Sequence, residues 1–298
     1  MQITTRTLQS SLRTLRPSAR HSTAPLQSSQ LLACKMSTTA PAMITQPSTS
    51  KPRLPVHVQR STSAWSMSPA TSTLIEAFES DPVTAYMLNH LPRSSRLPAL
   101  QKLFLLSSNA ALNAGGELWS ASTTSLSASS KPDFQAAATI FPPGKSLDDS
   151  GLSSLPGLLL GGGMVPALWS IGPSRFMSRM NAYSAATTPS KKVTFFNGET
   201  FFYVQLIGAG SQHRGKGLAP ALIRRLQERA SGEGKPIYLE ASNEGARRVY
   251  EKLGFEEVGE MIWLGKGECN VEGEVSDGEE AKGVPMWPMV WRPEGRST

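Results

Sequence analysis

The chain has 298 residues, of which 39% are hydrophobic and 18% are charged, a balance that excludes general disorder and is typical of a globular protein. The net charge of +7 suggests a nucleic-acid-binding protein, but residues 1–75 contain eight Lys and Arg and no acidic residue, so the rest carries a net charge of −1. We find no nucleic-acid-binding motif, and two cysteines with four scattered histidines give neither a disulfide framework nor metal-ligand spacing. The sequence thus predicts no nucleic-acid partner and no metal.

The segment 1–54 is rich in Ser, Thr and Arg. Leu8, Leu12 and Leu15 recur at helical spacing among arginines, which is typical of a mitochondrial transit peptide. A disordered tail without an address has the same composition. Met36 is a second potential start that would remove the Arg-rich part. We expect a disordered leader and a mitochondrial location, a cytoplasmic location, or both.

The body of the chain, residues 55–293, is predicted to alternate strands with helices. Its first half gives a strand at 56–60, a helix and a broken second helix within 68–88, a helix over 97–114, and strands at 116–122 and 136–144. Residues 145–192 predict helices with loops. The longest uncharged stretch, 151–174, could span a bilayer by length, but three consecutive glycines and three prolines oppose a helix in lipid. We expect no integral membrane segment.

The second half repeats the alternation of strands and helices. It predicts a strand at 199–209, a helix over 216–231, a strand at 236–241, a helix over 243–253, a strand at 255–265, an acidic loop within 266–283 and a strand at 284–293. Strict alternation would put Phe201, Tyr203, Gln205 and Ile207 on one face of the first of these strands. The mixed order predicts one three-layer α/β domain over residues 55–293.

A glycine-rich loop follows the strand at 199–209. Gly210 to Lys216 fits the G-x-x-x-x-G-K of a P-loop, but Gly217 replaces the Ser or Thr that binds Mg²⁺. A dinucleotide fingerprint fails because His213 stands at its third glycine. The stretch "RGKGLA" instead opens a helix directly after a strand, where free backbone N–H groups and the helix dipole bind pyrophosphate.

This loop resembles the pyrophosphate motif of the GNAT superfamily of N-acetyltransferases. Arg214-x-x-Gly217-x-Ala219 fits that motif, and the register Gln212-x-x-Gly215-x-Gly217 fits it as well. The first register places three leucines of the following helix on one face.

A second block strengthens the resemblance. The stretch "YLEASNEGARRVYEKLGFEEVGE" is similar to the block that follows in the same family, a strand and then Asn243-x-x-Ala246-x-x-x-Tyr250-x-x-x-Gly254-Phe255. Upstream, "IEAFESDPVTAYML" and "AAATIFPPGK" look like the first helix region and third strand of fungal-type members. The resemblance is strong over 199–265 and weaker over 55–292, and it does not cover the leader or 145–192.

The resemblance implies the GNAT fold, in which a twisted, mixed and mostly antiparallel sheet with one splayed strand pair is flanked by helices. It also implies transfer of an acetyl group from acetyl-CoA to a primary amine of a small molecule or peptide by direct attack. The alternative is a non-catalytic acyl-CoA-binding or interaction module on the same fold. The acceptor amine and the oligomeric state stay open.

The resemblance further implies roles for individual residues. The backbone of Ile207, Gly208 and Ala209 would bind the pantetheine chain, and the pyrophosphate would lie on the loop residues Gly215, Lys216, Gly217, Leu218 and Ala219. Arg214 and Lys216 would add charge to the loop, or remain solvated side chains.

Three expectations concern the chemistry. Asn243 would contact the cofactor, and Tyr250 would give a proton to the CoA sulfur, unless its ring only packs in the core. The family's strand carboxylate is missing, so Glu240 is the candidate base; its alternatives are a side chain directed to solvent or bonded to a neighbour, and a water chain. The acidic loop Glu268–Glu280 would attract a cationic amine, or be a solvated hairpin tip.

Overall fold

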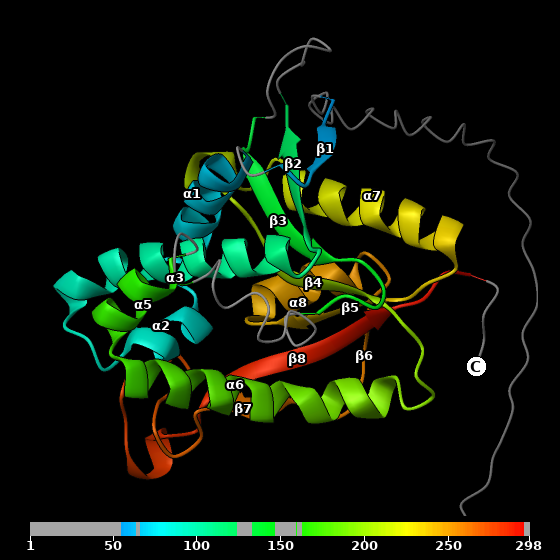
Figure 1. Cartoon of the computed structure of the whole chain (residues 1–298). Coiled ribbons are helices and arrows are strands. Elements are labelled where there is room, and N and C mark those ends of the chain that lie inside the picture. Colours follow the sequence, from blue (N-terminus) through cyan, green and yellow to red (C-terminus); the bar gives the residue numbers. More distant parts are fainter. Residues whose placement is uncertain (1–54, 64–65, 124–132, 147–158, 160–162, 295–298) are drawn as a thin grey trace, which may run out of the picture. The chain divides into compact units, whose positions relative to one another are not determined.

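The computed structural model describes residues 55–63, 66–123, 133–146, 159 and 163–294 (Figure 1). The chain divides into two units, Met1–Ser50 and Lys51–Thr298, and every described residue belongs to the second. The leader expected at 1–54 therefore lies outside the described residues.

The second unit is built on an eight-stranded sheet. Its strands follow the order β1-β2-β3-β4-β5-β8-β6, and β7 also pairs with β8. Paired strands are antiparallel except β4 and β5, which are parallel. The strands are β1 (His57–Ser61), β2 (Glu117–Ser122), β3 (Ala136–Phe141), β4 (Phe202–Ala209), β5 (Ile237–Ala241), β6 (Glu256–Glu257), β7 (Ile262–Leu264) and β8 (Val284–Trp291). This confirms the mixed, mostly antiparallel sheet.

Helices cover both faces of this sheet. They are α1 (Met67–Phe78), α2 (Pro82–Leu88), α3 (Arg93–Asn113), α5 (Met164–Ile171), α6 (Pro173–Thr194), α7 (Leu218–Glu233) and α8 (Glu244–Glu251), with short 3-10 helices at Ser211–His213 and Gly278–Glu280. One core cluster joins the sheet to α1, α2, α3 and α6, and a second joins it to α7 and α8. In Figure 1, α3 and α6 run above and below the region of β4 and β5. The strand pair that builds the site is thus framed by helices.

Two expected boundaries differ from the structure. The expected helix at 216 begins at Leu218, because Gly217 is its N-cap with φ of +77°. The single strand expected over 255–265 is wrong: β6 and β7 are separate, and Gly259 between them has φ of +69°. A left-handed residue breaks the extended backbone, which explains the interruption.

The expected alternation along β4 is also wrong beyond its middle. The β3–β4 pairing shifts between Thr139 and Ile140, which oppose Leu206 and Val204 and leave Gln205 in a bulge. A bulge inserts one residue and reverses the faces that follow it. Ile207 therefore packs with the α7 and α8 cluster instead of sharing the face of Tyr203.

Gly208 lies where α1 packs directly on β4. A Cβ atom at this position would lie 2.4 Å from the Cβ of Ala77, so only glycine allows the contact. We expect Gly208→Ala to lower the free energy of unfolding by about 1–3 kcal/mol through overpacking, as measured by urea denaturation.

The matched control is Gly232→Ala in α7, where an added Cβ meets nothing within 4 Å. This change should raise the free energy of unfolding by about 0.5–1 kcal/mol, because alanine has a higher helix propensity than glycine. Equal effects of the two variants would contradict the packing argument.

Candidate active site

The centre of the site is a gap between β4 and β5. These strands pair only at Phe202 with Ile237 and at Tyr203 with Tyr238, although β4 continues to Ala209. All six residues of β3 are buried, whereas 205–209 of the adjacent β4 are only partly buried. Strands β4 and β5 therefore diverge after the first two residues of each. Backbone groups of β4 that face away from β3 are left open to a ligand.

The divergence opens a cleft of about 1120 Å³. Its walls come from α1, α2, α3, α6, β4, β5 and the N-terminal ends of α7 and α8. The predicted site residues that line it are Ile207, Gly208, Ala209, Arg214, Gly215, Gly217, Leu218, Ala219, Glu240, Asn243 and Tyr250. Lys216 is exposed outside this lining, and its Nζ lies 3.2 Å from Nδ1 of His213. The structure thus brings together nearly all the residues that the two motifs singled out.

One end of the cleft is the glycine loop before α7. Gly215 and Gly217 have φ of +74° and +77°, and a Cβ on either would meet nothing within 4 Å. Their conformation, not crowding, requires glycine. The first helical residues, Leu218 and Ala219, carry N–H groups that have no partner within the helix, and Pro220 carries none. The loop can therefore direct several backbone donors at an anion.

Helix α1 braces this loop. The Glu76 carboxylate accepts hydrogen bonds from Ser211 N at 2.9 Å and from Ser211 Oγ, and these bonds lower the pKa of Glu76. Nη2 of Arg214 donates to the Ala77 carbonyl at 3.3 Å. An exposed loop is thereby held in one place beside the cleft.

Asp81 and Tyr250 both line the cleft. Asp81 is the N-cap of α2: its Oδ1 accepts from Val83 N at 3.0 Å, and its Oδ2 accepts from Ser242 Oγ at 2.5 Å. Burial raises the pKa of Asp81 even though these hydrogen bonds lower it. Burial also raises the pKa of Tyr250, and the negative charge of Asp81 raises it further. A carboxylate with a raised pKa and a phenol with a raised pKa therefore line the same cleft.

Asp81 is not among the site residues that the sequence predicted. Asp followed by Pro is a strong signal for a helix N-terminus, so the cap itself could have been predicted. Its burial beside Ser242 could not, because 161 positions separate the two residues.

Asn243 is the N-cap of α8. Its Oδ1 accepts a hydrogen bond from Ala246 N at 2.9 Å, which leaves the side-chain amide N–H groups for another partner. The contact with the cofactor stays a prediction.

Glu240 is buried and bonded to neighbouring side chains, which is one of the alternatives to its expected role as the base. Its side chain is 2% exposed, and Oε1 lies 3.2 Å from Nζ of Lys191. Oε2 accepts from the Tyr203 hydroxyl at 2.9 Å. The same ammonium lies 4.0 Å from the centroid of the Tyr203 ring. Burial and the charge of Glu240 raise the pKa of Tyr203.

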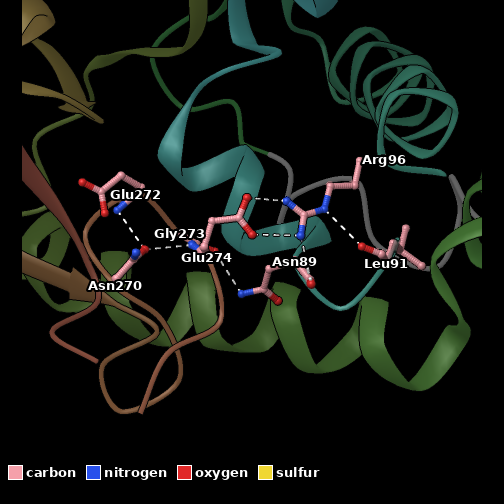
Figure 2. A network of polar contacts seen from close by, with 7 residues as sticks. All are labelled: Asn89, Leu91, Arg96, Asn270, Glu272, Gly273 and Glu274. Carbon is pink, nitrogen blue, oxygen red and sulfur yellow. Dashed lines mark hydrogen bonds and ion pairs between the residues drawn. The ribbon is translucent and has the colours of Figure 1, made fainter. Parts of the chain in front are cut away.

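The acidic loop packs against α2 and α3. Figure 2 shows that Nη1 and Nη2 of Arg96 donate to the Glu274 carboxylate, at 2.6 Å and 2.9 Å. Asn89 donates to the Gly273 carbonyl at 3.0 Å. Glu268 pairs with Arg179 in the same region. Glu274 and Glu268 are therefore paired with arginines of α3 and α6 and hold the loop against these helices, although the Glu268 side chain is still 56% exposed.

Two absences hold for the described part of the chain. No three His, Cys, Asp or Glu side chains in it gather as they would around a metal ion. No helix among the described residues combines the length and apolar character that crossing a membrane requires.

Comparisons with known proteins agree with this geometry. The model of the acetyltransferase (GNAT) family matches residues 187–255. Acetyltransferase Atu2258 of Agrobacterium fabrum is 35% identical over 69 residues, which are 23% of this chain and 50% of that protein, so the match spans half of the relative's length. A candidate arylalkylamine N-acetyltransferase 7 of the yellow fever mosquito has the same fold, with a TM-score of 0.50, 11% identity, and coverage of 80% of this chain and 87% of that one. Residues 187–255, which include the glycine loop and Tyr250, thus match the acetyltransferase (GNAT) family.

Proposed function

We propose that this protein is an acetyl-CoA-dependent N-acetyltransferase that acts on a primary amine by direct attack in a ternary complex. The observation that carries the proposal is the β4–β5 gap, which has a glycine loop at one end and Asp81, Ser242 and Tyr250 along its edge. This arrangement provides an anion site, an open strand edge and two groups for proton transfer in one cleft.

The chain offers acetyl-CoA a separate contact for each of its parts. The N–H groups of Gly217, Leu218 and Ala219 suit the pyrophosphate, and Arg214 adds positive charge at the rim. The open edge of β4 at 207–209 suits the amide groups of pantetheine, in the manner of an added strand. When bound there, acetyl-CoA supplies a thioester whose carbonyl carbon is the target of the amine.

Asp81 and Tyr250 divide the proton transfers between them. Asp81, with its raised pKa, takes the proton from the amine as the C–N bond forms. Tyr250 stays protonated at neutral pH and gives its proton to the sulfur as the C–S bond breaks. Ser242 holds the carboxylate in place. The products are an N-acetyl amine and CoA thiol.

Asp81 replaces Glu240 as the base in this proposal. Glu240 is committed to Lys191 and Tyr203, whereas the charge of Asp81 acts directly on Tyr250. A base should have a pKa near the working pH, and burial moves Asp81 in that direction.

Heat unfolding with acetyl-CoA tests the cofactor site. We expect acetyl-CoA to raise Tm by mass action, and S-acetyl-pantetheine, which lacks the pyrophosphate, to raise it much less at equal concentration. Release of CoA is then followed over a panel of amines. If acetyl-CoA raises Tm but no amine gives release of CoA, the non-catalytic binding module is favoured. If acetyl-CoA does not raise Tm, the cofactor assignment is wrong.

A further inference from the structure

A buried cation site lines the same cleft as Asp81 and Tyr250, which we call the transfer centre. Its carboxylate, on Glu240, is 2% exposed, and burying such a charge is costly without a partner. The ring face of Tyr203 covers one side, with its centroid 4.0 Å from the bound ammonium, and the centroid of Tyr238 is 5.9 Å away. A carboxylate with aromatic faces is the chemistry that recognises an ammonium ion. We call Glu240, Tyr203 and Tyr238 the ammonium box.

The ammonium in the box belongs to the chain itself. It is that of Lys191, in the last turn of α6, whose side chain is 26% exposed. Lysine has a flexible stem and can move its charge into water with little loss. Glu240 has no such route, because it is fixed on β5 and almost fully covered. The carboxylate is therefore the permanent part of the box and the ammonium is the exchangeable part.

The box lies close along the chain to Ser242, whose hydroxyl contacts the transfer centre. Ser242 directly follows β5 and is two residues after Glu240, so the Cα atoms of the two are at most roughly 7 Å apart. Ser242 donates to Asp81. Tyr183 also lines the cleft, and the charges of both Glu240 and Asp81 raise the pKa of its hydroxyl, after the larger effect of burial. Two negative groups therefore face one cleft a short distance apart.

We propose that the acceptor is a short α,ω-diamine whose distal ammonium enters the ammonium box in place of that of Lys191, while its proximal amine is acetylated at Asp81. The proposal rests on the proposed function and names its acceptor class. The distal nitrogen keeps its positive charge throughout, and the proximal nitrogen alone loses a proton and gains the acetyl group. Lys191 competes with the substrate for Glu240 and so weakens its binding in the unmodified protein.

Two variants of the full chain have opposite expected effects. Each is measured with α,ω-diamines and with amino alcohols of the same length, which carry an uncharged hydroxyl in place of the distal ammonium. Glu240→Gln should raise the diamine KM at least about tenfold and remove the preference over the amino alcohol, because one partner of a buried charge pair is lost. Lys191→Met keeps the apolar stem but removes the competing charge, so it should lower the diamine KM several-fold.

A second readout does not depend on turnover. Lys191→Met leaves Glu240 without its positively charged partner, so the Tm of the variant should fall, and a diamine should restore more of that loss than the amino alcohol does. If Lys191 were itself a substrate-binding residue, its removal would raise the diamine KM. If the pair were only structural, both variants would lose Tm without any diamine-specific recovery or change in preference. Either result overturns the ammonium box, whereas absence of CoA release with every amine in the unmodified protein would overturn the proposed function instead.

Discussion

Replacing Tyr250 by Phe is expected to lower kcat about 10²–10³-fold, because the leaving sulfur loses its proton donor. The ring of Tyr250 packs 5.7 Å from that of Phe255, a contact that phenylalanine keeps. The Kd of acetyl-CoA, measured by calorimetry, should therefore change little while the rate of CoA release falls.

Tyr86→Phe is the matched control for this experiment. Tyr86 is fully buried outside the lining of the cleft, and Arg179 lies 4.0 Å from the centroid of its ring, so the substitution removes only the Tyr86 hydroxyl. Its loss should leave kcat within a few-fold of the unmodified value. An unchanged kcat in Tyr250→Phe would show that Tyr250 is a packing residue only.

Replacing Asp81 by Asn is expected to lower kcat/KM about 10²–10⁴-fold, because the amine loses its proton acceptor. Asparagine keeps one oxygen that can cap α2, and its amide NH2 in place of Oδ2 can donate to Ser242 Oγ, so the local structure should persist. In the unmodified protein, activity should rise with pH as Asp81 loses its proton, above the usual range of an aspartate because its pKa is raised. The Asn variant should lack this acidic limb in a pH profile of kcat/KM.

The stability of the same variant separates chemistry from folding. The folded-state pKa of Asp81 is raised, so the protonated group stabilises the fold at low pH, and that contribution is lost as pH rises from the unfolded to the folded pKa. At neutral pH the Asn variant should thus be at least as stable as the parent in urea unfolding. Asp277→Asn, at an exposed loop position, is the control for the substitution itself. If Asp81→Asn were unfolded, its loss of activity could not be assigned to chemistry. If it were folded and fully active, Asp81 would not be the base.

The sequence by itself determined most of the elements and the glycine-loop end of the cleft. Those depend on local signals: the periodicity of apolar residues, the glycines with positive φ at 215 and 217, and the cap residue Asn243 before α8. Such signals act within a few residues of the chain, so they can be recognised from the sequence without the structure. They failed along β4 at Gln205, because a bulge is decided by the pairing with β3.

Only the tertiary structure decided the end of the cleft where the amine is proposed to bind. Asp81 meets Ser242 because α2 lies beside the end of β5, and Glu240 meets Lys191 because α6 crosses the same face. Burial and charge pairing set the proton affinity of a carboxylate, and both arise from elements far apart in the chain. Glu274 shows the same principle, since its partner Arg96 is 178 positions away. The sequence could therefore place an acetyltransferase motif, but the groups proposed to choose and deprotonate the amine became visible only where the helices close over β4 and β5.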